Sequence, residues 1–544
     1  MIKSFSLENL EKQVREISFN RKTLKLAILL FFVLATSYFF ISIFFGLDFS
    51  DGFYHINQAL YTYGDWSQHK FFLSSIIINY WVEVFGKNLL GLRFFNALII
   101  YLSALIPILF LKTRNRWEQV FTLGVVLVLI APLNANILGY DTFTIIICSI
   151  VFTILISFLK SKNNLKLGCL AFFCAAAVFI RFPNIILLGI VPLSLFIDKR
   201  IAGTNYKLVV KRSLIFLVLS FLFLISGYLL FFSNDQHFGE NFFTHGQSHQ
   251  IGALLKNYIS DAPAILLYSS IITLSFFLLK KIWKERLYWT LLLVIFLSIL
   301  MVIFIIDTKY ARSYSLMMTS IALVFSAILY LNSKPGSFHR VILASFVLML
   351  FVSPFGSDTG LLKSSFLFVL FPAVLSASFL EMRKLIMVTL LLILPFAFLE
   401  KVNAIYEDGK MHQLIAKPKN KLLSPVRTTE LRKTYLDKID EEVKKLTSED
   451  VSIYFYGKKS HLFTFLYPQA YSEAADFRQP LDDPKSIAEI RNKLIHTNKA
   501  AIFIVNSYPN ADDTSDESNK LVEELKENNF QKIKIGNLKY FLKR

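Results

Sequence analysis

Long apolar runs recur along the chain, and they restrict what it can fold into. Many are about 20 residues long, the length that crosses the hydrocarbon core of a bilayer as a helix. Polar backbone groups inside lipid must be satisfied within the spanning segment, so these runs predict α-helices. Of the 544 residues, 54% are hydrophobic, and the mean hydropathy is +0.51. The sequence therefore predicts a polytopic α-helical membrane protein and excludes an ordinary soluble domain.

We expect thirteen spanning helices, several of them short. A polar segment of about two dozen residues precedes the first span, and no small-residue cleavage site follows it, so no cleaved signal peptide is expected. One further apolar stretch, 71–85, is expected to lie at the outer interface, because a full span there would invert every later loop. The expected spans cover residues 24–46, 89–111, 117–133, 142–159, 165–180, 185–197, 208–232, 262–279, 287–306, 314–331, 341–352, 362–380 and 385–399.

The distribution of lysine and arginine predicts the orientation. Positive residues of membrane proteins gather on cytoplasmic connections. With a cytoplasmic N-terminus, the connections on that side carry about 25 Lys and Arg, and those on the other side about 7. This asymmetry accounts for the net charge of +19 without nucleic-acid binding, for which no basic patch with interleaved aromatics is present. An odd number of spans places the C-terminus outside the cytoplasm.

The chain changes character near residue 401, where charge rises and hydrophobicity falls to ordinary values. The expected parts are a cytoplasmic segment 1–23, a transmembrane domain 24–400 with a first outer loop 47–88, and an extracytoplasmic domain 401–544. The fold class is thus an all-α polytopic membrane domain with a small C-terminal α/β domain. Within that domain the patterns predict helices at 427–446 and 518–528, strands at 451–456 and 500–505, and a hairpin of 532–535 with 538–542 over Gly536-Asn537.

Ionisable and aromatic residues concentrate on the outer connections. An ionisable group at a span end costs free energy unless it faces water or a partner. Each such residue is therefore either a solvated helix anchor or part of a site, and for most of them both interpretations stay open. Asp51 and Asp141 favour a site, because each is embedded among glycine and aromatic residues. The other candidates for substrate binding are Asp48, Tyr54, His55, Arg181, Lys309, Arg312, Tyr314 and Asp358.

Metal ligation has little support in the sequence. His245 and His249 are four residues apart, but Gly246 lies between them and no glutamate completes a zincin-like pattern. The three cysteines lie inside apolar runs and are expected to be small core residues. The metal site stays unassigned, with a divalent cation as one option.

The first outer loop carries a family resemblance. Asp51-Gly52-Phe53-Tyr54, followed by Ala59 and Gly64-Asp65-Trp66, resembles the first periplasmic loop of the GT-C class of membrane glycosyltransferases. Members of this class that the loop resembles are the lipid A aminoarabinose transferases and the protein O-mannosyltransferases. Ser50 stands where the first acid of their acidic pair would be, which leaves Asp48 and Asp51 as alternatives for the catalytic carboxylate, with Asp51 favoured.

Two later stretches extend the resemblance. Asp141-Thr142-Phe143 looks like the family's second acidic position, and residues 309–314 look like the basic and aromatic start of a late span. The resemblance implies a polyprenyl-phosphate-linked sugar as donor. It also implies a glycan, lipid or protein acceptor and a bacterial-type plasma membrane as the location. Lys309 and Arg312 would then bind the donor phosphate, and Asp358 would contact sugar hydroxyls.

In this scheme Asp51 is the general base for, or positions, the acceptor hydroxyl. Asp141 positions the acceptor or binds a divalent cation. The alternative function is a transporter or flippase of lipid-linked sugars, which predicts charges within spans and discontinuous paired helices. The ionisable residues here crowd one face of the membrane, which favours the glycosyltransferase. A polysaccharide polymerase or ligase and a non-catalytic scaffold are further alternatives.

Overall fold

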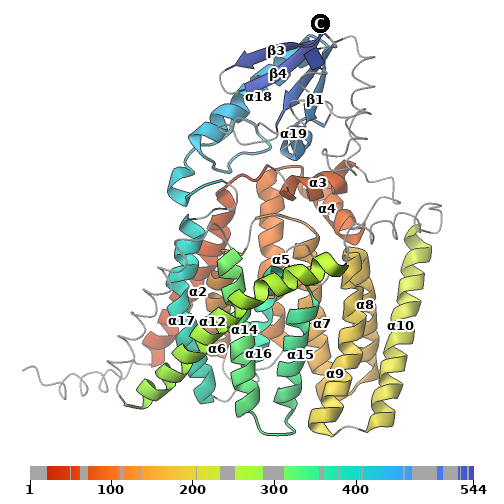
Figure 1. Cartoon of the computed structure of the whole chain (residues 1–544), viewed down its shortest axis with the longest axis vertical. Helices are drawn as coiled ribbons and strands as arrows, with labels where there is room; N and C mark the ends of the chain where they lie inside the picture. The colour runs from red at the N-terminus through yellow and green to blue at the C-terminus, as the bar shows by residue number, and fades with distance from the viewer. Residues whose placement is uncertain are drawn as a thin grey trace, which may run out of the picture.

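The structure is a computed structural model in which a helical bundle carries an α/β unit at one end (Figure 1). It describes residues 21–49, 51–61, 72–110, 116–133, 136–203, 205–232, 251–285, 312–354, 360–376, 380–403, 405, 408–456, 460–468, 499–505, 525–526, 529–535 and 538–543.

Seven helical segments of the described residues are long and apolar enough to cross a membrane, which makes the chain a multi-pass membrane protein. Shorter apolar helices accompany them, among them α8 and α15. The count of thirteen stays a prediction, and its segment 287–306 lies outside the described residues. The bundle comprises α2 (Arg21–Ile41), α5 (Leu89–Phe110), α6 (Arg116–Ile130), α7 (Tyr140–Ser161), α8 (Asn164–Ile180), α9 (Leu187–Ala202), α10 (Tyr206–Phe232), α12 (Ile251–Glu285), α14 (Arg312–Asn332), α15 (Phe338–Val352) and α17 (Leu380–Asn403).

Short local signals separate consecutive helices at the end of the bundle away from the α/β unit. Helix α7 ends where Lys162 adopts a left-handed conformation at φ 55°, and the Asn163 side chain then caps α8 by accepting a hydrogen bond from the Leu165 backbone N–H. Helix α9 ends at Gly203 with φ 74°, a conformation that glycine adopts without steric cost. These turns let α7, α8, α9 and α10 run back and forth beside one another.

The expected span 362–380 has a different form from the one predicted. Its first part is the 3-10 helix η4 (Gly360–Leu370), and its second is the short helix α16 (Phe371–Ser376). Pro372 has no backbone N–H and cannot continue an i to i−4 hydrogen-bond ladder, which explains a new helix starting there. The expected span 185–197 is likewise divided, into η3 (Phe182–Ile186) and α9.

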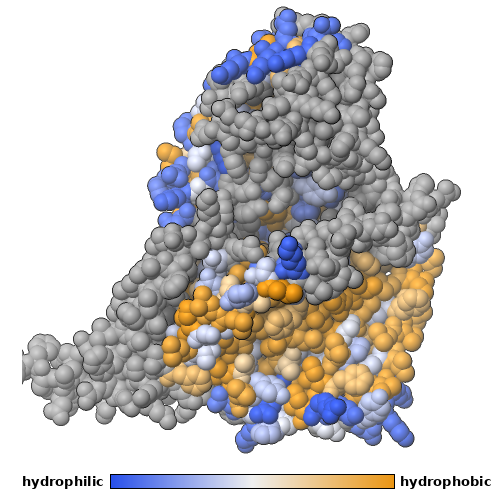
Figure 2. Space-filling model, viewed as in Figure 1, coloured by the Kyte–Doolittle hydropathy of each residue, from blue (hydrophilic) through white to orange (hydrophobic). Residues whose placement is uncertain are grey.

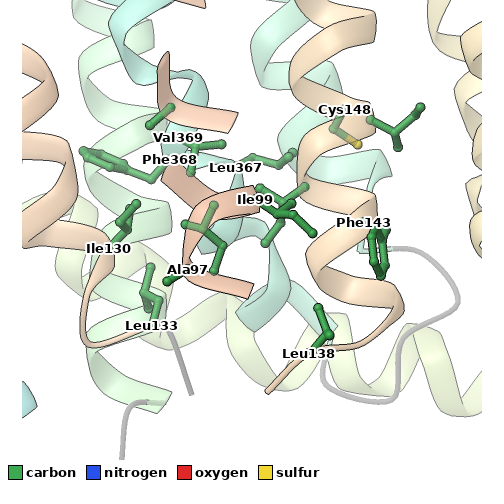
Figure 3. Close-up of a cluster of buried hydrophobic side chains, with 14 of the residues drawn as sticks. Ala97, Ile99, Ile130, Leu133, Leu138, Phe143, Cys148, Leu367, Phe368 and Val369 are labelled. Carbon is green, nitrogen blue, oxygen red and sulfur yellow. The ribbon is translucent and has the colours of Figure 1, made fainter. Parts of the chain in front are cut away.

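The centre of the bundle is packed with aliphatic and aromatic side chains from segments distant in sequence. Figure 3 shows Ala97 and Ile99 of α5, Phe143 of α7, and Leu367 and Phe368 of η4 in one cluster, each no more than 5% exposed. Around this core the outward faces are apolar as well, and α10 exposes Leu214, Phe221 and Leu230. Figure 2 shows this apolar surface as a belt with hydrophilic residues along its lower rim, the arrangement expected for a bundle that spans lipid.

Two helices lie at the end of the bundle that faces the α/β unit. Helix α3 (Asp51–Tyr61) and helix α4 (Phe72–Phe85) follow α2 and pack against each other. Helix α4 corresponds to the apolar stretch 71–85, which was expected to lie at the outer interface. Neither is among the seven long apolar segments.

The C-terminal unit (residues 405–543) contains a four-stranded sheet in the order β1-β2-β4-β3. Strands β1 (Ser452–Tyr456) and β2 (Ala500–Ile504) pair in parallel, and β3 (Gln531–Ile535) forms an antiparallel hairpin with β4 (Leu538–Lys543). Helices α18 (Glu430–Ser448) and α19 (Ser460–Leu466) accompany the sheet. The predicted strands, hairpin and polar helix are confirmed, whereas most of the helix expected at 518–528 lies outside the described residues.

Candidate functional site

The link between α2 and α3 is held from two sides. The Arg93 guanidinium of α5 donates hydrogen bonds to the carbonyls of Ile43 at 3.0 Å and Gly46 at 2.6 Å. From the other side, Arg427 of the C-terminal unit exchanges backbone hydrogen bonds with Phe44 and Gly46 at 2.7 and 2.9 Å. The segment before α3 is therefore fixed by both parts of the molecule.

A buried ion pair completes this attachment. The backbone N–H of Leu47 donates to Asp408 Oδ2 at 2.7 Å, and Arg432 Nη1 donates to the Leu47 carbonyl at 2.7 Å. Arg432 Nη1 lies 3.1 Å from Asp408 Oδ1, and neither side chain is more than 6% exposed. Thr428 donates a further hydrogen bond to Asp408 at 2.7 Å. We call Asp408, Thr428 and Arg432 the Leu47 clamp.

Asp48 follows directly and caps α3. Its Oδ2 accepts the backbone N–H of Gly52 at 2.9 Å, and the residue is only 5% exposed. Asp48 stands two residues before the N-cap position of α3, and its carboxylate satisfies a first-turn N–H that has no partner within the helix. Asp48 thus has a structural role, and the choice of Asp51, the first residue of α3, as the functional carboxylate of this loop stays a prediction. The side chain of Asp51 lies outside the described part of the chain.

Asp141 is the centre of a charged cluster at the start of α7. Its carboxylate accepts hydrogen bonds from Lys363 Nζ of η4 at 2.7 and 3.0 Å, and Arg181 Nη1, at the end of α8, lies 3.8 Å away. The Tyr140 ring contacts both cations, with Arg181 Cζ at 4.8 Å and Lys363 Nζ at 5.0 Å from its centroid. The side chains of Asp141, Arg181 and Lys363 together carry a formal charge of +1.

Polar side chains fix the elements that bring this cluster together. Asn184 of η3 donates to the Thr144 hydroxyl of α7 at 3.1 Å and to the Ala177 carbonyl of α8 at 3.0 Å, which holds the corner containing Arg181 against α7. Asp261 of α12 accepts the Leu361 backbone N–H at 3.2 Å and so holds the start of η4, two residues before Lys363. The cluster is therefore built on packed helices.

Aromatic rings adjoin the charges. His55 of α3 meets the Tyr140 ring edge-to-face, with centroids 4.7 Å apart. The Tyr54 ring contacts two histidine rings: its centroid lies 5.2 Å from that of His55 and 5.2 Å from that of His461 of α19. A Cβ on Gly139 would stand only 3.0 Å from the His55 ring, so glycine there permits the close approach of α3 to α7. The C-terminal unit thus reaches the site through His461.

Burial keeps both imidazoles neutral. It lowers the pKa of His55 to about 4, an effect that the nearby Lys363 and Arg181 reinforce and Asp141 opposes. Burial also lowers the pKa of His461 to about 4 and raises the pKa of Tyr54 above its ordinary value. Near neutral pH these residues therefore supply uncharged aromatic and hydrogen-bonding surface beside the charged cluster.

The structure brings together four of the residues predicted from sequence: Tyr54, His55, Asp141 and Arg181. Tyr314 has a different place. It is fully buried, and its hydroxyl donates to the Leu129 carbonyl at 2.6 Å, so it packs in the bundle core and does not join the cluster. Lys309 and Asp358, and the side chain of Arg312, lie outside the described part of the chain.

Three residues of the site were not recognised as such from the sequence. Tyr140 stands next to Asp141, and its position after a glycine at a span start was a usable signal. Lys363 is one of the few lysines on the expected outer side, which was a weaker signal. Nothing in the local sequence marks His461, because its place depends on how α19 docks on α3.

The described residues contain no group of three or more His, Cys, Asp or Glu side chains that could hold a metal ion. The Asp141 carboxylate faces two cationic side chains instead. This donor set does not fit a divalent cation at Asp141.

No family model matches the chain, and no curated protein matches it. Among solved structures, ArnT from Cupriavidus metallidurans bound to undecaprenyl phosphate matches at 12% identity and a TM-score of 0.45, covering 95% of this chain and 97% of that chain. The apo state of the same protein matches over the same shares at a TM-score of 0.43. ArnT is one of the aminoarabinose transferases that the first outer loop resembles. A match this distant assigns no role to any residue here.

Proposed function

We propose that the chain is a membrane glycosyltransferase that moves a sugar from a polyprenyl-phosphate donor to an acceptor hydroxyl at the end of the bundle that bears the C-terminal unit. The observation that carries the proposal is the cluster of Asp141, Arg181 and Lys363 beside the His55 and Tyr140 rings. It combines an excess of positive charge with an aromatic wall, at the end of a lipid-spanning bundle.

Each part of this cluster suits one part of such a donor. The lipid tail partitions into the apolar surroundings of the bundle. The phosphate requires cationic hydrogen-bond donors, which Arg181 and Lys363 supply. The sugar presents C–H groups to an aromatic ring and hydroxyls to polar side chains, and His55 with Tyr140 offers both kinds of surface. Lys309 and Arg312 remain predicted phosphate ligands, and Asp358 a predicted sugar ligand.

The transfer itself balances without another reagent. The acceptor oxygen forms a bond to the anomeric carbon, and the bond from that carbon to the phosphate oxygen breaks. The polyprenyl phosphate leaves with the bonding electron pair, and the acceptor proton passes to a carboxylate. Asp51 is proposed as that base, because it shares a face of α3 with His55, four residues on. Arg181 and Lys363 stabilise the charge that develops on the leaving phosphate.

Asp141 holds the two cations close to each other and in place. Without its negative charge, Arg181 and Lys363 would repel each other in a partly desolvated site. Its side chain is 36% exposed, whereas Arg181 is 6% exposed, so a ligand can approach Asp141 from the open side. This arrangement supports a positioning and electrostatic role for Asp141 in the transfer.

The test is mass spectrometry of lipid-linked sugars and envelope glycans in cells with the intact chain, without it, and with Asp141→Asn. The expected result is loss of one sugar modification and accumulation of its polyprenyl-phosphate donor, in the deletion and in the variant. Glu83→Gln is the matched control, since Glu83 is an exposed acid of α4 whose carboxylate contacts Asn79 and not the cluster.

The position of the accumulated donor separates a transferase from a flippase. If the accumulated donor reacts with a membrane-impermeant reagent, it lies in the outer leaflet, which supports transfer at that face. Donor confined to the inner leaflet would support the transporter instead. Normal glycans with Asp141→Asn, at wild-type protein levels, would refute the site assignment.

A further inference from the structure

A shallow groove lies at the opposite end of the bundle from the C-terminal unit. It occupies the first three turns of α10, has a volume of about 430 Å³, and is lined by Tyr206, Lys207, Val210, Lys211, Leu214 and Ile215. The lining residues recur at intervals of four, so the groove has two adjacent rows. One row is Tyr206, Val210 and Leu214, and the other is Lys207, Lys211 and Ile215.

Positively charged side chains border the groove near Tyr206, although its own lining is apolar. Lys207 and Lys211 are exposed and one helical turn apart, and no carboxylate of the described residues is within ion-pair distance of either. Lys199, from the last turn of α9, lies 4.1 Å above the Tyr206 ring and adds a third cation at the edge. Asp198, the acid nearest in sequence, is instead paired with Lys162. These lysines therefore place exposed positive charge beside an apolar groove.

The other end of the groove is apolar and continues along α10. Leu214, Val218 and Leu222 are each more than half exposed. Eight residues of helix rise about 12 Å, which is close to the depth of one leaflet's hydrocarbon layer. Figure 2 shows hydrophilic residues along the rim of the bundle below its apolar belt, which is where a lipid headgroup region would lie.

We infer that this groove binds an anionic phospholipid of the leaflet opposite the C-terminal unit, with its phosphate between Lys207 and Lys211 and an acyl chain along Leu214 and Val218. The inference does not depend on the proposed glycosyltransferase activity. Charge disfavours the main alternative occupant, a second copy of the chain, because a two-fold contact through this face would bring Lys207 and Lys211 against the same lysines.

The test is native mass spectrometry of the full chain released from nanodiscs that contain phosphatidylglycerol and phosphatidylethanolamine. Wild-type protein is expected to retain phosphatidylglycerol in preference to phosphatidylethanolamine, and the Lys207→Gln, Lys211→Gln double variant to lose this preference. The expected fall in affinity is about 30-fold, equivalent to about 1 kcal/mol for each of the two charges.

A second double variant, Lys160→Gln with Lys334→Gln, is the matched control. It removes the same charge from exposed positions on the same rim but outside the groove. Retention of phosphatidylglycerol by this control supports a defined site. Equal loss in both variants would show diffuse attraction to the rim and overturn the inference, as would no loss in either. A dimer that dissociates when Leu214→Gln is introduced would assign the groove to a second copy and overturn it too.

Discussion

Removing Arg432 should destabilise the molecule at the attachment between its two parts. Its guanidinium neutralises Asp408, whose side chain is fully buried, and also satisfies the Leu47 carbonyl. Arg432→Ala leaves a buried carboxylate without its counter-charge, a change that typically costs about 3–5 kcal/mol. The lost contact between the guanidinium and the Phe49 ring, 5.2 Å apart, adds to this.

Thermal unfolding in detergent measures the effect. For a chain of 544 residues the entropy of unfolding corresponds to about 1 °C per kcal/mol, so the midpoint temperature of Arg432→Ala should fall by about 4 °C. Lys419→Ala is the matched control, because Lys419 pairs with Glu441 at 3.0 Å but both side chains are 63% exposed. Exposed pairs contribute little to stability, so this control should unfold close to the wild-type temperature.

The loss of stability caused by Arg432→Ala should also depend on pH and be larger at higher pH. Burial raises the pKa of Asp408, and Arg432, Thr428 and the Leu47 N–H oppose that rise. Loss of Arg432 therefore raises this pKa further. A carboxyl whose pKa is higher in the folded state favours folding below its ordinary pKa of about 4, and this contribution is lost as pH rises through the folded pKa. The variant should thus lose more stability at pH 8 than at pH 5. Equal midpoints for Arg432→Ala and Lys419→Ala, at both pH values, would refute the reasoning.

Three further outcomes test the site. Lys363→Gln should raise the apparent Kd for the polyprenyl-phosphate donor about 10- to 100-fold, because one charge-assisted hydrogen bond is lost. The control Lys256→Gln changes an exposed lysine of α12 and should leave this Kd unchanged. Equal effects of the two variants in a donor-binding titration would exclude Lys363 as a phosphate ligand. His55 and His461 bind protons more readily in the unfolded chain, so the stability of the protein should fall as pH drops from about 6.5 towards about 4. Replacing both histidines by Gln should make stability depend less on pH in this range. An unchanged pH dependence would contradict their burial as neutral groups. Tyr314→Phe should cost about 1 kcal/mol of stability through its lost hydrogen bond, without changing donor affinity, and a weakened affinity would return Tyr314 to the substrate site.

Local sequence properties determined much of the architecture. Apolar runs of about 20 residues predict helices, because a helix of that length crosses lipid with all its backbone hydrogen bonds made within one segment. The change to a charged tail predicted a separate α/β unit, and Gly536-Asn537 between two short apolar segments predicted the β3–β4 hairpin. These inferences depend only on residue composition and spacing, which can be read locally anywhere along the sequence.

The sequence also restricted the site, since it identified polar residues at the outer ends of expected spans. Tyr54, His55, Asp141 and Arg181 were found in this way, and the structure brings them within contact of one another or of a shared neighbour. A residue that serves the fold can stand at the same kind of position as a site residue. Asp48 and Tyr314 have the same residue types as site residues, but the first caps α3 and the second binds a core carbonyl.

Tertiary packing alone decided which residues complete the cluster. Lys363 reaches Asp141 across 222 positions of sequence, and it does so because Asp261 and the core around Leu367 hold η4 beside α7. His461 reaches Tyr54 because the Leu47 clamp and α19 fix the C-terminal unit on α3. Such contacts depend on how separately formed helices pack, and packing is set by side-chain shapes along whole surfaces. A local pattern can therefore place a residue at one end of the bundle, but only the assembled structure selects its neighbours.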